Sequence, residues 1–486
     1  MSEEQLRLKA PLIVQMEITP ECNNRCGFCY NFWEYDLESS LSRISSTDEA
    51  KVRGLFEVLV KKEVPAVCFT GGEPFLAENL LFDLLKRANQ EGMYTSINSH
   101  GRQITRNSAH RLNEQGLNSI LISLHGDTEE VHGEAVGCPE AFTQTLVGLD
   151  NLLDEGINLT VNYVSTQKNV GRIVSTAKLL NDKGVCNMTI TPLLPFPGVQ
   201  DHELWAMKRE QFRQYFDALI SARETGLRID STLPVAPCIL KDMFPENYLD
   251  YLEVLSPRVC MAGVTFMVVS PDGINRACIQ APQLEEYGSD INGNFLESWK
   301  RANAWSRMGL LTSECSDLCY ALPSCGGGCR TSSLACNHST SGKTMYMGGP
   351  LSEADSQSFI DRMEVNLGDI GRRFRKRTNV RFREEDFGGV ISLCSRQDFV
   401  FLDREGLTNF HSLPSEFEMD LPSRGIKVLY AAGIIQNVEH SSELPHYSIK
   451  MPVVHTSRLY PRLAGGIPMD DKVRMLRADT GERIYF

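Results

Sequence analysis

The sequence predicts an α/β fold, in which a partial (β/α)6 TIM-like barrel is followed by a cysteine-rich domain and a small α+β domain. Three observations carry this prediction. Apolar, β-branched runs alternate with amphipathic stretches over residues 13–223, a pattern typical of parallel strands joined by crossover helices. The alternation stops over residues 233–340, where cysteine, glycine and proline are frequent. Short strand-like runs return over residues 380–411, with a turn expected at Gly388-Gly389.

The barrel strands are expected where short β-branched runs are bounded by polar or turn-forming residues. Six such runs are present: Ile13–Ile18, Ala66–Phe69, Tyr94–Ile97, Ser119–Leu124, Leu159–Val164 and Met188–Leu194. Six strand–helix units are enough for a partial barrel, and an open parallel sheet is the alternative.

Helices are expected between these strands. The stretch 47–62 opens with a capping box at Ser46. Its apolar residues recur on one face: Val52, Leu55, Phe56 and Leu59. Two more helices are predicted over 141–155 and 170–183, the second of which ends at Gly184, a suitable C-cap.

Composition limits the class of protein. The chain has 486 residues and 42% of them are hydrophobic, which suits several packed cores and not a disordered chain. Its net charge of −13 repels phosphate backbones, so no nucleic acid partner is expected. No secretory signal is recognised and no apolar stretch reaches the roughly 18 residues of a membrane span. We therefore expect a cytoplasmic protein with no membrane partner.

Cysteine motifs carry most of the chemical information. Fifteen cysteines in a chain without a secretory signal indicate metal or redox chemistry rather than disulfides. Cys22, Cys26 and Cys29 form a CxxxCxxC pattern directly after the first expected strand. Three soft thiolates can hold three irons of a four-iron cluster and leave the fourth iron open for a substrate. Zinc is the alternative, but a closed zinc site usually takes four protein ligands.

This pattern resembles the CxxxCxΦC signature of the radical S-adenosylmethionine (radical SAM) superfamily, and Phe28 occupies its aromatic position. The resemblance implies a [4Fe-4S] cluster that cleaves S-adenosylmethionine (SAM) reductively and so begins radical chemistry. The end of the second expected strand resembles the family's GGEP motif: Thr70, Gly71, Gly72, Glu73 and Pro74. By that resemblance the segment contacts the methionine moiety of SAM, where glycine lets the backbone approach the ligand and Glu73 orients the amine.

The same resemblance implies SAM contacts at the ends of the next strands. Ser123 would contact the ribose, and Asn98, in SINSHG where relatives more usually carry TNG, would contact the cofactor. His125 is a weak catalytic candidate, because buried structural histidines are common. All these positions follow the C-terminal ends of expected parallel strands, where barrels of this kind place their sites.

A second group of cysteines resembles the SPASM extension of radical SAM enzymes, which binds two auxiliary [4Fe-4S] clusters. The resemblance assigns four cysteines to each cluster: Cys238, Cys260, Cys278 and Cys329 to the nearer one, and Cys315, Cys319, Cys325 and Cys336 to the farther one. Three residues separate Cys315 from Cys319, where the family has two. Zinc in one or both sites is the alternative, and Cys138 could stand in for Cys238.

The segment beginning RFREEDFG resembles the small winged-helix-like domain that captures leader peptides during maturation of ribosomally made peptides. In that domain type an extended peptide adds a strand to a sheet edge. The alternative is that this segment is only a structural cap over the SPASM region. The resemblances together divide the chain into five parts: 1–225, the radical SAM partial barrel; 226–345, the SPASM domain; 346–378, a linker and helix; 379–436, the peptide-recognition-like domain; and 437–486, a C-terminal tail.

The leading hypothesis is a radical SAM/SPASM maturase that abstracts hydrogen from a ribosomally synthesised precursor peptide. The modification would be a crosslink, an epimerisation, a decarboxylation or an excision. Its partners would be the precursor peptide and an electron donor such as flavodoxin or ferredoxin. The alternatives are radical modification of a folded protein or a small molecule, and a non-catalytic iron–sulfur electron carrier. The sulfatase-maturing branch carries an Asp after the hairpin cysteine, where this chain has Ile279 after Cys278.

Overall fold

The computed structural model describes residues 8–30, 47–194, 202–231, 235–255, 260–281, 289–305, 318–319, 325, 327–337, 348–352, 354–355, 372–386, 388–394, 399–419, 429–430 and 434–438, and three short strands nearer the C-terminus. The helix expected within 346–378 falls almost wholly outside these ranges. Within them, no helix is both long enough and apolar enough to cross a membrane.

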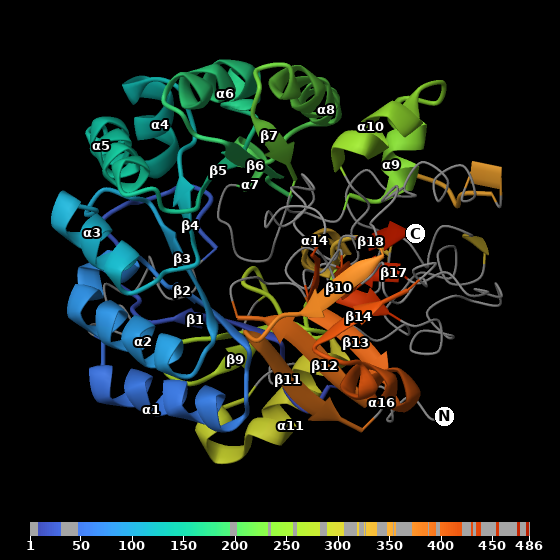
Figure 1. Ribbon diagram of the computed structural model, residues 1–486. Coiled ribbons are helices and arrows are strands. Elements are labelled where there is room, and N and C mark those ends of the chain that lie inside the picture. The colour runs from blue at the N-terminus through green and yellow to red at the C-terminus, as the bar shows by residue number, and fades with distance from the viewer. Residues whose placement is uncertain are drawn as a thin grey trace.

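A curved, mostly parallel sheet forms the centre of the molecule (Figure 1). Its strands lie in the order β7-β6-β5-β4-β3-β2-β1-β8-β9. The six expected strands are all present, which confirms the predicted α/β fold: β1 (Ile13–Glu17), β2 (Ala66–Thr70), β3 (Tyr94–Ser99), β4 (Ser119–Ser123), β5 (Leu159–Ser165) and β6 (Asn187–Pro192). In the described part of the chain β7 and β9 are the two edges of the sheet, so the barrel stays open.

Three strands that the sequence pattern did not predict extend this sheet. β7 (Arg228–Asp230) pairs with β6, and β8 (Phe266–Val269) pairs in parallel with β1. β9 (Asn275–Arg276) returns antiparallel to β8 after a turn at Gly273, where a φ of +87° suits glycine. The sheet thus crosses the division expected at residue 225 and takes β8 and β9 from the cysteine-rich part. Four helices accompany them: α9 (Pro237–Met243), α10 (Tyr248–Leu255), α11 (Ile291–Ala304) and α14 (Arg330–Asn337).

Helices cover the outer face of the sheet (Figure 1). They are α1 (Glu49–Lys61), α2 (Glu78–Gln90), α3 (Arg106–Glu114), α4 (Glu129–Val136), α5 (Ala141–Asp154), α6 (Ile173–Asp182) and α8 (Arg209–Arg223). The short helix α7 (His202–Trp205) lies apart from them, where Trp205 packs against Phe28 of the first cysteine motif with ring centroids 5.6 Å apart. All four apolar residues predicted for the inner face of the first helix are buried in α1. The capping box expected at Ser46 is wrong, since the N-cap is Asp48, whose Oδ1 accepts from the Lys51 amide at 3.0 Å. Gly184 follows α6 with a φ of +84°, as predicted for its end.

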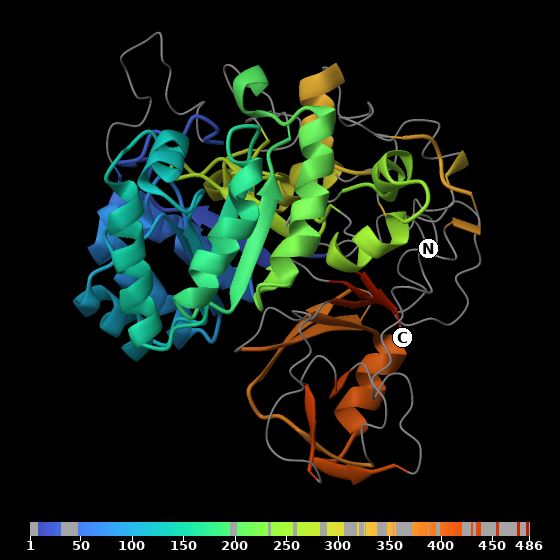
Figure 2. The same ribbon diagram turned by 90° about the horizontal axis from the view of Figure 1, so that it is seen from above.

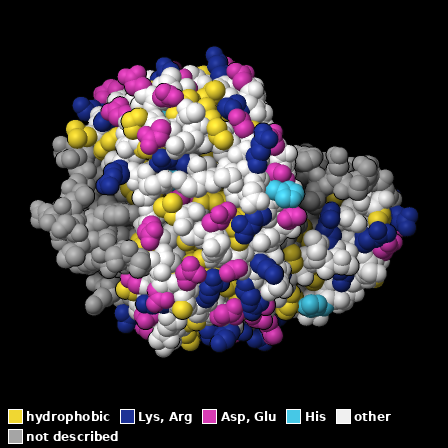
Figure 3. Space-filling model, turned by 90° about the vertical axis from the view of Figure 1, so that its left-hand side faces the viewer, with side chains coloured by type: hydrophobic (Ala, Val, Ile, Leu, Met, Phe, Trp, Pro, Cys, Tyr) yellow, Lys and Arg dark blue, Asp and Glu magenta, His cyan; other side chains and the backbone are white. Residues whose placement is uncertain are grey.

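Basic and acidic side chains are interspersed on the outer surface of these helices (Figure 3). Arg53 of α1 pairs with Glu49 at 3.2 Å and with Asp83 of α2 at 2.8 Å. Arg87 of α2 pairs with Glu57 of α1 at 2.8 Å. Exposed pairs of this kind contribute about 0–1 kcal/mol each, so this face is a solvated exterior rather than a charged binding surface.

The two faces of the sheet differ in polarity. Isoleucines and valines point outward under the helices and are fully buried, as with Ile97, Ile122 and Val161. The residues between them point into the barrel and are half-buried on four successive strands. We call these residues the lumen wall: Ser96, Asn98, Leu121, Ser123, Asn162, Val164 and Thr191. The parallel register places Asn98 opposite Leu121 and Ser123 opposite Asn162.

The described C-terminal part is mainly β-structure, arranged as two sheets with strand orders β14-β10-β15 and β11-β12-β13-β16-β17-β18. Its elements are β10 (Arg373–Lys376), β11 (Val380–Glu385), β12 (Gly388–Leu393), β13 (Phe399–Asp403), α16 (Arg404–Ser412), β14 (Glu416–Glu418), β15 (Ile435–Asn437), β16 (Val453–His455), β17 (Arg474–Leu476) and β18 (Arg483–Tyr485). Gly388-Gly389 begins β12 instead of forming the expected turn. The basic run 372–377 contains strand β10.

The C-terminal sheets contact the barrel at the end opposite the first cysteine motif. Arg383 of β11 is buried and donates to the carbonyl oxygens of Ala10 at 2.7 Å and Pro11 at 3.0 Å. Glu385 accepts from the Lys9 amide at 2.9 Å. Because β1 runs away from residues 9–11, this contact lies at the N-terminal ends of the barrel strands, as Figure 2 shows.

Candidate active site

The cysteine loop, residues 18–30, follows β1 at the C-terminal end of the barrel. Cys22, Cys26 and Cys29 all lie on it and are half-buried. The Cys22 sulfur accepts from the Asn24 amide at 3.4 Å, and the Cys29 amide donates to the Cys26 carbonyl at 3.1 Å. Ordinary turn geometry therefore brings the three expected ligands onto one short loop.

Gly71 and Gly72 pack this loop against the end of β2. The Gly72 amide donates to the Thr19 carbonyl at 2.8 Å, and the Glu73 amide donates to the Glu21 carbonyl at 2.7 Å. A Cβ atom on Gly72 would lie 2.1 Å from the Glu21 oxygen, and one on Gly71 would lie 2.3 Å from the Thr19 oxygen. Glycine is required at both positions because no side chain fits between the two backbones. Close packing of the loop is thus a second reason for these glycines, beside the expected approach of a ligand.

Glu73 forms its hydrogen bonds inside the protein. Its carboxylate accepts from the Phe75 amide at 3.1 Å, from Ser99 Oγ at 2.8 Å and from the His100 amide at 2.9 Å. The side chain is 1% exposed. Glu73 also caps the short helix that Pro74 opens. Through these hydrogen bonds Glu73 connects the end of β2 to the end of β3, a role that the sequence pattern did not suggest.

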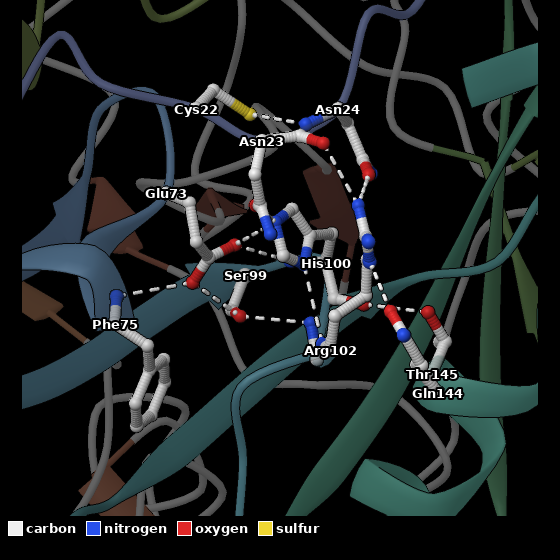
Figure 4. A network of polar contacts seen from close by, with 11 residues as sticks. Cys22, Asn23, Asn24, Glu73, Phe75, Ser99, His100, Arg102, Gln144 and Thr145 are labelled. Carbon is white, nitrogen blue, oxygen red and sulfur yellow. Dashed lines mark hydrogen bonds and ion pairs between the residues drawn. The ribbon is translucent and has the colours of Figure 1, made fainter. Parts of the chain in front are cut away.

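His100 and Arg102 support the cysteine loop from the end of β3 (Figure 4). Arg102 Nη1 donates to the Asn23 carbonyl at 2.8 Å and to Asn24 Oδ1 at 2.6 Å. His100 Nδ1 accepts from the Arg102 amide at 3.2 Å. The ring proton is therefore on Nε2, which lies 2.7 Å from Asn23 Oδ1 and 3.2 Å from Glu73 Oε2. The sequence motifs predicted neither residue, although both are polar residues that directly follow an expected strand.

Burial sets the charge state of this network. Burial raises the pKa of Glu73 to about 7, although hydrogen bonds from His100, Ser99 and Phe75 oppose the shift. Burial and the nearby Arg102 lower the pKa of His100 to about 3. His100 is consequently neutral at physiological pH, and the guanidinium of Arg102 is the cation that faces the loop backbone.

The raised pKa of Glu73 predicts that the iron-free protein loses stability as the pH rises. The pKa is about 7 in the folded protein and 4.5 ordinarily, so this contribution is complete below pH 4.5 and is lost as the pH passes 7. The difference between these two pKa values corresponds to roughly 3 kcal/mol of the free energy of unfolding at most. Between pH 5 and pH 8, the free energy of unfolding measured with denaturant should fall less for Glu73→Gln than for the wild type. Equal losses would contradict the assignment.

Asn98 and Ser123 lie on the lumen wall, at the C-terminal ends of β3 and β4. Both side chains are half-buried. Ser123 lies opposite Asn162, whose Oδ1 accepts from Thr191 Oγ1 at 3.0 Å. These hydroxyl and amide groups can bind a neutral polar ligand such as a ribose.

Phe28 and His125 pack against each other where the cysteine loop meets β4, with ring centroids 5.2 Å apart. His125 Nδ1 accepts from the Val164 amide at 3.1 Å. Burial, with a smaller effect from His132, lowers the pKa of His125 well below its usual value. His125 is therefore a neutral ring in the packing around the loop, which favours the structural interpretation over the catalytic one. Thr70, at the end of β2, lies 3.4 Å from the Tyr30 hydroxyl.

Three cysteines of the second group lie close together. Burial raises the pKa of Cys260 to about 11 and that of Cys329 to about 12, and the neighbouring Cys278 adds to both shifts. An effect of one thiol on the pKa of another requires nearby sulfur atoms. Cys238 is buried on α9. Of the other expected ligands, Cys325 is buried and Cys319 is half-buried, whereas Cys315 and the side chain of Cys336 lie outside the described residues.

The described cysteines are all free. In the same ranges, no three His, Cys, Asp or Glu side chains meet at a point where one metal ion could bind. A four-iron cluster makes a different demand, because each thiolate binds its own iron. Burial raises the pKa of Cys26 well above its usual range, and Cys29 and Cys22 add to the shift. Thiols in this state become thiolates when metal binds, so the donor set of the loop fits an iron–sulfur cluster.

Comparisons with known proteins agree with this geometry. A family model described as the radical SAM superfamily matches residues 16–167, which include the cysteine loop and the end of β2. An AdoMet-dependent heme synthase of Oleidesulfovibrio alaskensis is 25% identical over 304 residues, which cover 60% of this chain and 74% of that protein. A PqqA peptide cyclase of Ruegeria pomeroyi is 23% identical over 339 residues, which cover 68% of this chain and 85% of that protein.

Among solved structures, Streptococcus suis SuiB bound to S-adenosylmethionine superposes with a TM-score of 0.55 at 18% identity. The superposition covers 71% of this chain and 79% of SuiB. At this level of identity the likeness concerns the fold.

Proposed function

The chain is a radical SAM enzyme, and from this premise we propose that it modifies a ribosomally synthesised precursor peptide. Cys22, Cys26 and Cys29 would hold the SAM-binding [4Fe-4S] cluster. Residues Thr70–Pro74 with Phe28, Asn98 and Ser123 would hold SAM. When bound, the cluster would supply the single electron that cleaves the C5′–S bond of SAM, which would release methionine and the 5′-deoxyadenosyl radical that abstracts hydrogen from the substrate. The enzyme assignment also removes the non-catalytic electron carrier from the alternatives.

The uncharged lumen wall is the observation that carries the choice of a peptide. Its members from β3 to β6 are neutral hydroxyl, amide or apolar side chains, with no Lys or Arg among them. Peptide backbones offer amide hydrogens and carbonyl oxygens that such groups satisfy. The PqqA peptide cyclase relative and SuiB, which was solved bound to the precursor peptide SuiA, support the same class of substrate.

A tetrapyrrole is the second candidate, because the Oleidesulfovibrio alaskensis relative is a heme synthase. Haem precursors carry several carboxylates, which proteins usually bind with Arg or Lys. The described lumen wall contains no Arg or Lys, so a tetrapyrrole is a weaker candidate for the substrate than a peptide. A folded protein substrate stays third, because Ile279 follows Cys278 where the sulfatase-maturing branch has Asp.

The second cysteine group would hold two auxiliary [4Fe-4S] clusters, the nearer on Cys238, Cys260, Cys278 and Cys329. The farther one would use Cys315, Cys319, Cys325 and Cys336. The effects of Cys278 on the pKa of Cys260 and of Cys329 support this proposal. Flavodoxin or ferredoxin would supply electrons.

The C-terminal sheets would recognise the leader of the precursor. Among the described strands β11 lies at an edge of its sheet, and an edge strand can pair with an extended peptide. Deleting 379–436 is a poor test, because Arg383 and Glu385 also bind the start of β1. Precursor and leaderless peptide should instead be compared on the intact enzyme, where loss of the leader should weaken binding and leave the fold unchanged.

The substrate class predicts the behaviour of the reconstituted, reduced enzyme with SAM. Peptides encoded beside its gene are expected to raise the rate of 5′-deoxyadenosine formation at least about tenfold over the peptide-free rate, as correct substrate binding completes the site. Mass spectrometry should detect a changed peptide. Iron coproporphyrin serves as the competing probe. Stimulation by the porphyrin and by none of the peptides would overturn the proposal.

A further inference from the structure

A buried ion pair connects two strands that are far apart in sequence. Glu17 is the last residue of β1, and Arg276 is the last residue of β9. Arg276 Nη2 donates to Glu17 Oε1. The side chains are 0% and 1% exposed for Arg276 and Glu17, so water does not share this contact.

The pair stands between the two cysteine groups. Glu17 leads into the loop that carries Cys22, and Arg276 lies two residues before Cys278. β8 runs beside β1 with Met16 opposite Val269, and the turn after β8 brings Arg276 back across that strand. A single side-chain contact thus ties the hairpin that ends at Cys278 to the strand that enters the first cysteine loop.

Stability alone does not explain charged residues at this place. Removing two charges from water costs several kcal/mol per ion, and well-packed apolar residues often replace such a pair without loss. Burial raises the pKa of Glu17, while Arg276 and Ser270 lower it and Asp272 raises it. The pair therefore places a guanidinium two residues from Cys278, in an interior that charged groups enter only at a cost in free energy.

We propose that Glu17 and Arg276 are positioning residues that fix the Cys278 hairpin to β1 and set the reduction potential of the cluster that Cys278 binds. This inference rests on the proposed function, since it needs an auxiliary cluster on Cys278. The Arg276 cation favours the reduced, more negative cluster. Glu17 limits that effect, because its charge has the opposite sign and lies in the same low-dielectric interior.

The test compares reduction potentials in the reconstituted full-length protein, followed by electron paramagnetic resonance. Glu17→Gln leaves the cation uncompensated, so the potential of the auxiliary cluster should become more positive than in the wild type. The double variant Glu17→Gln/Arg276→Gln removes the cation and should give the most negative potential of the three. Iron is measured in each sample to show that the clusters are retained.

Arg383→Gln is the matched control. Arg383 and Glu385 form another buried ion pair, with side chains 5% and 0% exposed, at the opposite end of the barrel. This control should lower the unfolding temperature as the other variants do, and should leave the potentials unchanged. If the wild type contains auxiliary clusters and their reduction potentials are the same in all these variants, the inference is overturned and the proposed function is not. A wild type with no cluster beyond the first cysteine loop overturns the auxiliary part of the proposed function, and the inference with it.

Discussion

Replacing Cys26 by Ala is expected to abolish 5′-deoxyadenosine formation and to leave the barrel folded. Cys26 is the middle ligand of the loop, and two remaining thiolates do not retain a four-iron cluster. The activity should fall by more than the roughly 10–100-fold that loss of a second-shell partner costs a metal site. Iron should fall from about twelve to about eight per chain if three clusters are present in the wild type.

Cys186→Ala is the control for this substitution. Cys186 is an exposed free cysteine just before β6, so its removal should change neither the iron content nor the rate. Equal iron in Cys26→Ala and the wild type would show that the first loop holds no cluster. Zinc in place of iron in the wild type would show the same by a second measurement.

Local patterns were sufficient to predict the first six strands of the barrel and to place the three cysteines of the first motif directly after β1. The six runs from Ile13 to Leu194 follow a period that a parallel sheet imposes on each strand separately. The loop cysteines are close in sequence, so any compact turn brings them together. The residues at the end of β2 could be placed for a similar reason, because neighbouring parallel strands end on the same side of a barrel.

Contacts between distant segments were beyond that kind of prediction. His100 forms a hydrogen bond with Asn23, which is 77 residues away in sequence, and Arg276 forms one with Glu17, which is 259 residues away. β8 is four residues long and joins β1 from the cysteine-rich part, where no repeating pattern marks it. The hydrogen bonds of Glu73 could not be predicted from its motif, because two of the three partners are Ser99 at the end of β3 and His100 directly after it.

Gly72→Ala is expected to disrupt the backbone packing between the end of β2 and the cysteine loop. The added Cβ would lie 2.1 Å from the Glu21 carbonyl oxygen and 2.6 Å from the Pro20 oxygen. Both are backbone atoms, which cannot move aside as a flexible side chain does. The substitution should destabilise the protein by roughly 1–3 kcal/mol. It should also displace the loop that carries Cys22, so iron retained after reconstitution should fall together with the unfolding temperature.

Gly54→Ala makes the same chemical change where there is space. Gly54 is exposed in the middle of α1, and nothing lies within 4 Å of an added Cβ. Alanine favours a helix interior over glycine by about 1 kcal/mol, so this control should raise the unfolding temperature and keep the iron content. The two substitutions therefore have opposite expected signs. A Gly72→Ala protein that matches the wild type in both measurements would mean that the loop is not packed against β2. The carbonyl contacts of Thr19 and Glu21 would then have no part in holding the cysteines.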